Sequence, residues 1–172
     1  MELTAQVGAR LRALREARGM SLSELARTSE IGKGTLSELE SGRRNPTLET
    51  LYALTTALHV PLSTVLTAAA AHPGISGQAV DAVLLDRFDG SDAVTETYRI
   101  RIRAGARQES TAHAPGTVEY VLVLSGTARF GNLTAPRLLG PGMHARCPAD
   151  IPHLYEAVST DVDALLSVRY PA

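Results

Sequence analysis

Residues 21–46 read SLSELARTSEIGKGTLSELESGRRNP, and their pattern indicates two short helices joined by a turn. Ser21 stands directly before an apolar-periodic run, and Glu24 follows three residues later. That spacing is the capping box, in which a serine oxygen accepts from an orphan backbone amide at a helix start. The pattern therefore predicts a helix that begins at Leu22.

A second short helix is predicted in the same stretch. It should begin near Lys33, with Gly32 as a permissive N-cap, and end at Gly42, a residue type favoured just past helix ends. Two short helices joined by a tight turn and followed by a basic loop are typical of a helix-turn-helix. Such a unit places its second helix in the major groove of DNA. A five-helix domain that binds protein is the weaker alternative, because the polar residues on this helix and loop have no structural need to follow that pattern.

Helical periodicity continues on both sides of this stretch. A first helix is expected from about Thr4 to Ala17 and should stop at Gly19. A fourth should follow Thr47 as its N-cap, and a short fifth should follow Pro61. These expectations make residues 1–66 a five-helix domain.

Residues 7–66 resemble the Xre-type helix-turn-helix domain of the lambda and 434 repressors. The resemblance implies that base-reading positions fall on Lys33, Gly34, Thr35 and Glu38, and that Arg43, Arg44 and Asn45 lie in the loop that meets phosphates. The complete set expected to contact DNA is Ser21, Ser23, Lys33, Gly34, Thr35, Ser37, Glu38, Arg43, Arg44 and Asn45.

The same resemblance implies a buried salt bridge between Arg15 and Glu40. Two residues depart from the family pattern. Leu22 stands where the family often has a glutamine that contacts the DNA backbone. Glu30 stands where the turn often has a glycine, so mild backbone strain is expected there.

Length and charge point to two domains and to a dimer. The chain has 172 residues and a formal net charge of −1. Residues 1–66 carry eight Lys and Arg against seven Asp and Glu, and residues 67–172 carry nine against eleven. Because neutralisation of phosphates dominates DNA affinity, one copy of so weakly basic a domain should bind DNA weakly. A homodimer is therefore expected.

Other compositional features exclude several classes of protein. Cys147 is the single cysteine, which excludes a disulfide within the chain and a cysteine-based zinc site. The first ten residues lack a basic segment followed by an apolar one, and no apolar run is long enough to cross a membrane. The expected location is the cytoplasm, with no membrane partner.

After the helical region the sequence period changes from 3.6 to 2. Residues 67–79 are small and turn-rich and are predicted to be a linker. The run YRIRIR, residues 98–103, alternates strictly, and its three arginines are expected on a solvated outer face in preference to a phosphate or DNA site. Further strands are predicted at Val80–Asp86, Val118–Leu124, Thr127–Phe130, Met143–Cys147, His153–Val158 and Asp163–Tyr170. Many short strands at this spacing predict an antiparallel sandwich or barrel over residues 80–172.

Residues 80–170 resemble the cupin fold, a double-stranded β-helix barrel. The resemblance rests on a segment with His113 and Glu119 and on a later PADIPH segment with His153. Thr111 stands where a metal-binding cupin has its first histidine, and Glu109 could replace it only if its loop curled inward. Two imidazoles and one carboxylate suit a divalent first-row metal with open coordination positions. The alternative is a metal-free polar floor for an organic ligand.

The whole chain resembles the bacterial Xre-cupin regulators. The resemblance implies a transcriptional regulator that is not an enzyme, in which a dimer reads a pseudo-palindromic double-stranded DNA operator and the barrel senses a small-molecule effector. Two alternatives stay open. One is a cupin-type metal-dependent enzyme fused to a DNA-binding domain, and the other is a DNA-binding protein whose barrel only dimerises.

Overall fold

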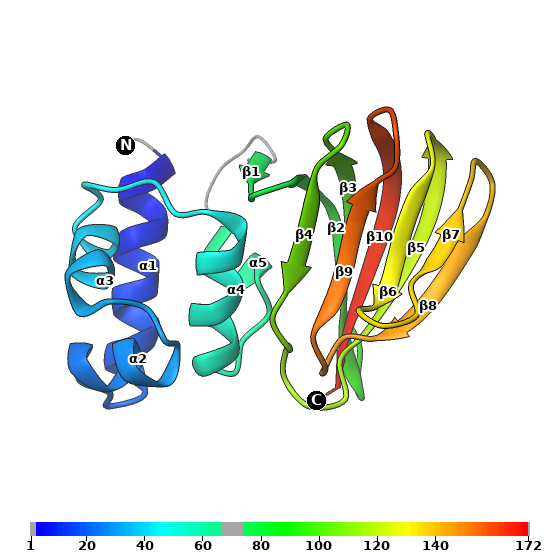
Figure 1. The fold of residues 1–172 in the computed structure, drawn as a ribbon. Coiled ribbons are helices and arrows are strands. Elements are labelled where there is room, and N and C mark those ends of the chain that lie inside the picture. The colour runs from blue at the N-terminus through cyan, green and yellow to red at the C-terminus, as the bar shows by residue number, and fades with distance from the viewer. Residues whose placement is uncertain (1–2, 67–73, 172) are drawn as a thin grey trace. The chain divides into compact units, whose positions relative to one another are not determined.

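The computed structural model describes residues 3–66 and 74–171. The chain divides into two compact units at Pro73 and Gly74, with every described helix in the first unit and every described strand in the second (Figure 1). None of the described helices is long and apolar enough to cross a membrane.

The first unit contains five helices, as the sequence predicts. They are α1 (Leu3–Ala17), α2 (Leu22–Thr28), α3 (Lys33–Glu40), α4 (Leu48–Ala57) and α5 (Ser63–Leu66). The predicted starts of α2 at Leu22 and of α3 at Lys33 are confirmed. The core is mostly leucine, and its fully buried members include Leu11, Leu25, Leu36, Leu39, Leu51, Leu54, Leu58 and Leu62.

Helices α1 and α3 pack closely because a glycine stands at their contact. A β-carbon added to Gly8 of α1 would lie 2.1 Å from the carbonyl oxygen of Leu39 in α3. That distance is far shorter than any real contact, so only glycine fits. After α3 the chain turns at Gly42, whose φ of 69° is in the left-handed region that favours glycine. The close packing and this turn fix the position of α3 within its unit.

The second unit contains two antiparallel sheets that face each other (Figure 1). The six-stranded sheet has the order β1-β2-β3-β10-β5-β8, and the four-stranded sheet has the order β4-β9-β6-β7. Their bounds are β1 (Gly74–Ser76), β2 (Val80–Asp89), β3 (Ala93–Ile102), β4 (Arg107–Ser110), β5 (Val118–Ser125), β6 (Ala128–Asn132), β7 (Arg137–Leu139), β8 (His144–Pro148), β9 (His153–Ala157) and β10 (Val162–Pro171). The unit has the cupin fold, as a sandwich whose sheets are not joined into one continuous barrel by strand pairing among the described residues.

Part of the predicted linker belongs to this sandwich. Residues 74–76 form β1 and pair with Asp81–Val83 of β2, so the expectation of a linker through residue 79 is wrong for this segment. Residues 67–73 of the predicted linker lie outside the described residues. The short strands β4 and β7 were not predicted either.

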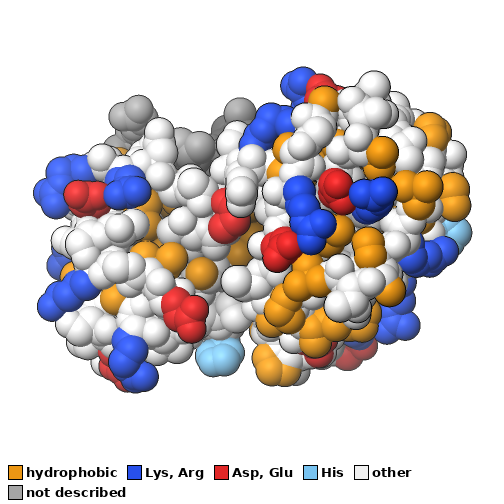
Figure 2. All heavy atoms as spheres, in the orientation of Figure 1, with side chains coloured by type: hydrophobic (Ala, Val, Ile, Leu, Met, Phe, Trp, Pro, Cys, Tyr) orange, Lys and Arg blue, Asp and Glu red, His pale blue; other side chains and the backbone are white. Residues whose placement is uncertain are grey.

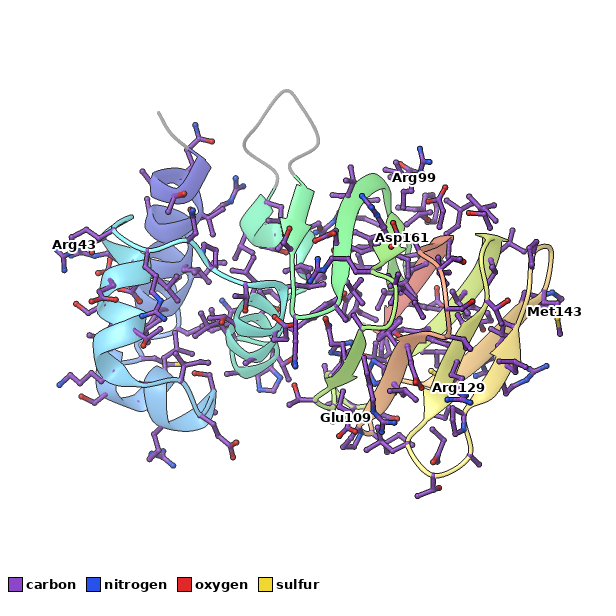
Figure 3. The ribbon with its side chains drawn as sticks, turned by 45° about the horizontal axis from the view of Figure 1, so that its top comes forward. Arg43, Arg99, Glu109, Arg129, Met143 and Asp161 are labelled. Carbon is purple, nitrogen blue, oxygen red and sulfur yellow. The ribbon has the colours of Figure 1, made fainter. Side chains whose placement is uncertain are left out.

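The alternating arginines of β3, together with Arg103 just after it, lie on the outer face of their sheet, as predicted. Each forms an ion pair with an aspartate: Arg99 with Asp163, Arg101 with Asp161, and Arg103 with Asp81. Figure 3 labels Arg99 and Asp161 on this outer face. The residues between these arginines, Ile100 and Ile102, are buried between the sheets.

Candidate nucleic-acid interface and buried polar cluster

Helix α3 divides cleanly into a buried side and an accessible side. Leu36 and Leu39 lie in the core, with exposed fractions of 0% and 2%. Lys33 and Gly34 are exposed, and the remaining predicted contacts Thr35, Ser37 and Glu38 are partly exposed. Figure 2 shows basic side chains over the surface of the helical unit near α2 and α3. The polar side of α3 is thus available to a partner.

The entry into α2 is held by the predicted cap. The Ser21 hydroxyl oxygen accepts a hydrogen bond from the Glu24 backbone amide at 3.1 Å. Ser23, one of the expected DNA contacts, is exposed in the first turn of α2. Leu22 is partly exposed and lies in a shallow hollow with Ser37 and Ser41, at the position where the repressor family often has a polar residue. Leu22 therefore places an apolar side chain where the repressor family has a contact to the DNA backbone.

The turn before α3 carries the strain expected from its sequence. Glu30 has a φ of 57°, in the left-handed region that a non-glycine residue enters only at a cost. The turn nevertheless closes, because the Ile31 amide donates to the Ala26 carbonyl oxygen at 3.0 Å.

The basic loop after α3 exposes all three predicted phosphate contacts, Arg43, Arg44 and Asn45. The Arg43 side chain points outward from the helical unit (Figure 3). The Arg44 guanidinium donates to the Glu38 carboxylate at 3.3 Å, and the Asn45 side-chain oxygen accepts a hydrogen bond from the Thr4 hydroxyl. The loop is therefore tied to α3 and to α1.

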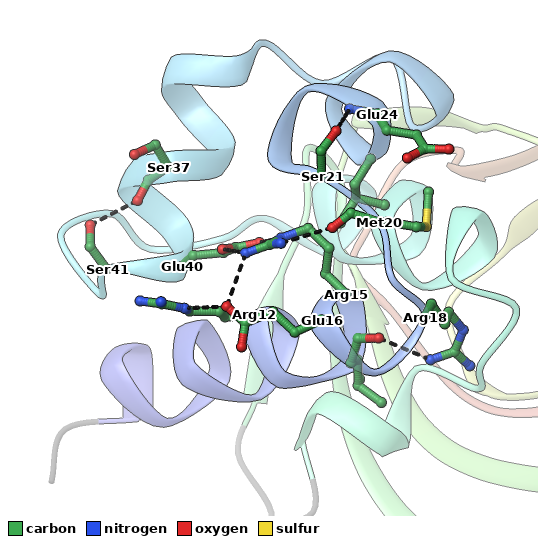
Figure 4. Close-up of polar contacts among 12 residues, drawn as sticks. Arg12, Arg15, Glu16, Arg18, Met20, Ser21, Glu24, Ser37, Glu40 and Ser41 are labelled. Carbon is green, nitrogen blue, oxygen red and sulfur yellow. Dashed lines mark hydrogen bonds and ion pairs between the residues drawn. The ribbon is translucent and has the colours of Figure 1, made fainter.

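The salt bridge implied by the repressor resemblance is present (Figure 4). Arg15 donates to both carboxylate oxygens of Glu40, at 2.7 and 2.8 Å, and also to the Met20 carbonyl oxygen at 2.9 Å. Its side chain is 11% exposed and that of Glu40 is 7% exposed. The hydrogen bond from Glu40 raises the pKa of Arg15 above its ordinary value. This pair connects α1, the entry to α2 and the end of α3.

In the second unit, three predicted site residues meet between the sheets. Glu119 comes from β5 of the six-stranded sheet, His153 from β9 of the four-stranded sheet, and His113 from the segment before β5. All three are buried, and one ligand atom from each lies within 4.8 Å of the others. We refer to these three residues as the His–Glu–His cluster.

Hydrogen bonds orient each member of the His–Glu–His cluster. The His113 Nε2 is 3.1 Å from Glu119 Oε1, and the His153 Nε2 is 3.4 Å from Glu119 Oε2. The His153 Nδ1 donates to the Ile151 carbonyl oxygen at 2.9 Å, which leaves its Nε2 facing the carboxylate. The Tyr155 hydroxyl also donates to Glu119 Oε2. Sequence reasoning missed Tyr155, although its position two residues after His153 on one strand places both on the same face.

The surroundings of Glu119 and His153 favour the charged forms of these two residues. Burial alone would raise the pKa of Glu119, but the charge of His153 and the hydrogen bonds from His113 and His153 lower it well below its ordinary value. Burial alone would lower the pKa of His153, but the Glu119 charge raises it above its ordinary value. Each charge therefore stabilises the other in a site with little access to water.

The donor set fits a first-row metal ion. Ligands about 2.1 Å from an octahedral ion and at right angles to each other lie roughly 3 Å apart. The two imidazoles lie 3.1 and 3.4 Å from different oxygens of Glu119, and one ligand atom from each of the three residues lies within 4.8 Å of the others, so a bound ion would draw the three side chains slightly closer.

The two residues considered for a fourth ligand lie outside the cluster. Thr111 is exposed. Glu109 lies in strand β4, where it is exposed and paired with Arg107, so it does not turn inward (Figure 3). The site is a three-residue set.

The nearby His144 is exposed, whereas Cys147 is buried opposite Glu119 on the next strand. Burial together with the Glu119 charge raises the pKa of the Cys147 thiol to about 12.

Several known proteins resemble this chain in sequence or in fold. Residues 11–65 match the family model described as Helix-turn-helix. The HTH-type transcriptional regulator SutR of Escherichia coli (strain K12) is 32% identical over 148 residues, which cover 84% of this chain and 83% of SutR. A solved HTH_3 family transcriptional regulator from Vibrio cholerae superimposes with a TM-score of 0.86 and 26% identity, over 99% of this chain and 98% of that one. The Cupin_2 domain of an XRE family transcriptional regulator from Enterobacter cloacae is 30% identical and covers 55% of this chain and 100% of that domain, with a TM-score of 0.49.

The fold and the exposed polar side of α3 define a helix-turn-helix protein with a cupin unit after it. The chain belongs to the HTH-type transcriptional regulators. It is accordingly a DNA-binding regulator of transcription.

Proposed function

We propose that this regulator is a homodimer that reads a pseudo-palindromic operator with two copies of α3 and that its cupin unit senses a small-molecule effector. The first unit is proposed as the DNA-binding domain and the second as the sensor and dimerisation domain. The proposal rests on the presence, in one chain, of both an accessible polar side of α3 and a buried His–Glu–His cluster.

The DNA contacts follow from exposure and chemistry. Lys33 is placed to reach a base edge from the start of α3, and Arg43 is placed to meet a phosphate from the loop. A contact to a base changes sequence preference, whereas a contact to a phosphate strengthens binding to every sequence. Two half-sites one helical turn apart, about 34 Å, would suit a symmetric dimer. Duplication of the weakly basic domain would also compensate for its low charge.

The proposed effector site is the His–Glu–His cluster, with Tyr155 as a supporting donor. A divalent metal held by His113, Glu119 and His153 would supply a Lewis-acid centre with open positions for an effector. Without a metal, the same polar groups would hydrogen-bond an organic effector directly. Binding would alter operator affinity only if the effector preferred one disposition of the two reader helices over the other.

DNA binding is tested with two variants and a matched control. Lys33→Ala should weaken binding to the selected operator much more than to unrelated DNA. Arg43→Ala should weaken binding to all sequences. It should also reduce the slope of log affinity against log salt concentration by about one. Arg18→Ala removes an exposed arginine of the first unit that is not predicted to meet DNA, and it should bind like the parent. If Lys33→Ala and Arg43→Ala also bind like the parent, the proposed reading surface is wrong.

Sensing is tested by native mass spectrometry of the purified dimer together with elemental analysis. One metal or small molecule per subunit, lost in a His153→Ala variant, would support the sensor site. The cluster also resembles the ligand set of metal-dependent oxygenases, so a metal-dependent enzyme is the second candidate. Turnover of a bound small molecule by the metal-loaded protein would favour that candidate. A dimer whose operator affinity no metal or metabolite alters would indicate that the cupin unit only dimerises.

A further inference from the structure

We infer that Glu38, held by Arg44 and standing beside the bare backbone at Gly34, selects cytosine in each half-site of the operator. The contact would be a hydrogen bond from the cytosine N4 amino group to the Glu38 carboxylate. This inference rests on the proposed function, because it requires α3 to lie in the major groove.

The first step is the position of Glu38 on α3. Gly34 and Glu38 are four residues apart, so they lie on the same face of the helix. Long helical side chains tend to cover the face of the preceding turn, so the face that Glu38 shares with Gly34 is the one beside its side chain. Glu38 has a side-chain exposure of 47% and is available to a partner.

The second step is that no contact within the protein requires a glycine at position 34. A β-carbon added to Gly34 would meet no atom within 4 Å, in contrast to Gly8, where it would collide with the Leu39 carbonyl oxygen. Glycine costs about 1 kcal/mol relative to alanine in a helix, and no protein contact here compensates for it. The open space beside Gly34 lets a base edge approach the helix backbone next to the Glu38 carboxylate.

The third step is the charge of Glu38. A carboxylate in the major groove is repelled by the phosphates on either side, so it needs a nearby positive charge. Arg44 provides that charge through its 3.3 Å contact with Oε2, and its side chain is 55% exposed. An exposed ion pair of this kind adds little to stability, so its value lies in the charge that it places beside Glu38. Among the described contacts, no hydrogen bond is made to Oε1, which leaves an acceptor for a base.

The fourth step is the chemistry of base edges. An ionised carboxylate only accepts hydrogen bonds. Guanine and the oxygen of thymine present acceptors in the major groove, whereas cytosine N4 and adenine N6 are donors. Adenine also carries the N7 acceptor beside N6, which would repel the second carboxylate oxygen. Cytosine alone offers a donor without an adjacent acceptor on the same base.

The experiment uses the full-length protein and operators selected from a randomised DNA pool. The parent protein defines the operator, and its affinity is then measured for cytosine, thymine and adenine at each position of the half-site. Glu38→Gln should shift the preference at one position per half-site from cytosine toward adenine, because glutamine pairs with both N6 and N7 of adenine. Glu38→Ala should reduce the discrimination between cytosine and thymine at that position by about tenfold.

Two further variants separate base selection from general electrostatics. Glu16→Gln removes the same charge from an exposed glutamate that is also paired with an arginine, Arg12, and should leave every base preference unchanged. Arg44→Ala should weaken binding to all operators and should also reduce the cytosine preference, because it removes the positive charge beside Glu38.

The outcomes distinguish this inference from the proposed function. If the parent protein selects no operator from the pool, both fail. If it selects an operator but Glu38→Gln keeps the same preference at every position, the inference alone fails. If Glu38→Gln and Glu16→Gln both tighten binding equally to all sequences, Glu38 merely repels phosphate and the inference is again overturned.

Discussion

The buried ion pair between Arg15 and Glu40 gives the sharpest test of how the helical unit is held together. Glu40→Ala removes both hydrogen bonds that the carboxylate accepts, at 2.7 and 2.8 Å, and leaves the Arg15 guanidinium with little access to water. Removal of one partner of a fully buried pair costs about 3–5 kcal/mol. Because these side chains keep 11% and 7% of their exposure, we expect a loss of about 2–4 kcal/mol in the free energy of unfolding.

The expected loss is large enough to measure in a thermal transition. For a domain of this size, 1 kcal/mol shifts the Tm by about 4–8 °C, so the first unit of Glu40→Ala should melt at least about 8 °C below the parent. The far-UV circular dichroism of helices reports on this unit specifically, because all described helices belong to it. As a control, Arg12→Ala breaks the exposed ion pair between Arg12 and Glu16 within α1 and should shift the Tm very little.

A double variant tests the cause of the loss. In Arg15→Met with Glu40→Leu, apolar side chains replace both charges, so no charge is left without its partner. Such a replacement is often neutral or even stabilising, and the double variant should recover most of the stability that Glu40→Ala loses. If Glu40→Ala melts no lower than Arg12→Ala, the explanation is wrong. If the double variant melts as low as Glu40→Ala, the loss comes from packing and not from an unpaired charge.

Three further predictions concern single residues. Gly34→Ala should stabilise the first unit by up to about 1 kcal/mol in thermal unfolding, because alanine favours a helix and nothing in the protein fills the space beside Gly34. The same variant should weaken operator binding in a gel-shift titration, because the added methyl group would occupy the space that DNA needs. Tighter binding would contradict a close approach of DNA at Gly34. Gly8→Ala should destabilise the same unit by about 1–3 kcal/mol in urea unfolding, because its β-carbon would overlap the Leu39 carbonyl oxygen; an unchanged midpoint would refute the close packing of α1 and α3. Cys147 should react with a thiol reagent at mildly alkaline pH far more slowly than in the urea-unfolded protein, because it is 6% exposed and its pKa is raised to about 12; equal rates would show that the sandwich opens readily.

Sequence reasoning is most successful for structural features that depend on local interactions, such as helix starts and caps. The starts of α2 and α3 and the cap at Thr47 are correct, because each depends on contacts within a few residues. The strain at Glu30 is also predicted correctly, since it follows from a non-glycine residue in a turn that needs positive φ. These features require no knowledge of distant parts of the chain.

Features that depend on distant pairing were harder to predict. The strands β4 and β7 have four and three residues and are too short to show a clear alternation. β1 has only three residues, two of which, Gly74 and Ser76, are typical of turns, and its pairing with β2 makes it a strand. The convergence of His113, Glu119 and His153 came from resemblance, and their role in binding stays a proposal. The hydrogen bond from Tyr155 to Glu119 joins two sheets and has no signal in the sequence beyond the shared face with His153.

The central position of β10 has a consequence for the order in which the two units fold during synthesis. This strand pairs with β3 on one side and with β5 on the other, although about sixty residues separate its start from the end of β3. The six-stranded sheet thus lacks its central member until Val162–Pro171 has left the ribosome. The helical unit relies on contacts close in sequence and can fold much earlier. On a nascent chain, the helix-turn-helix should therefore form before the β-sandwich does.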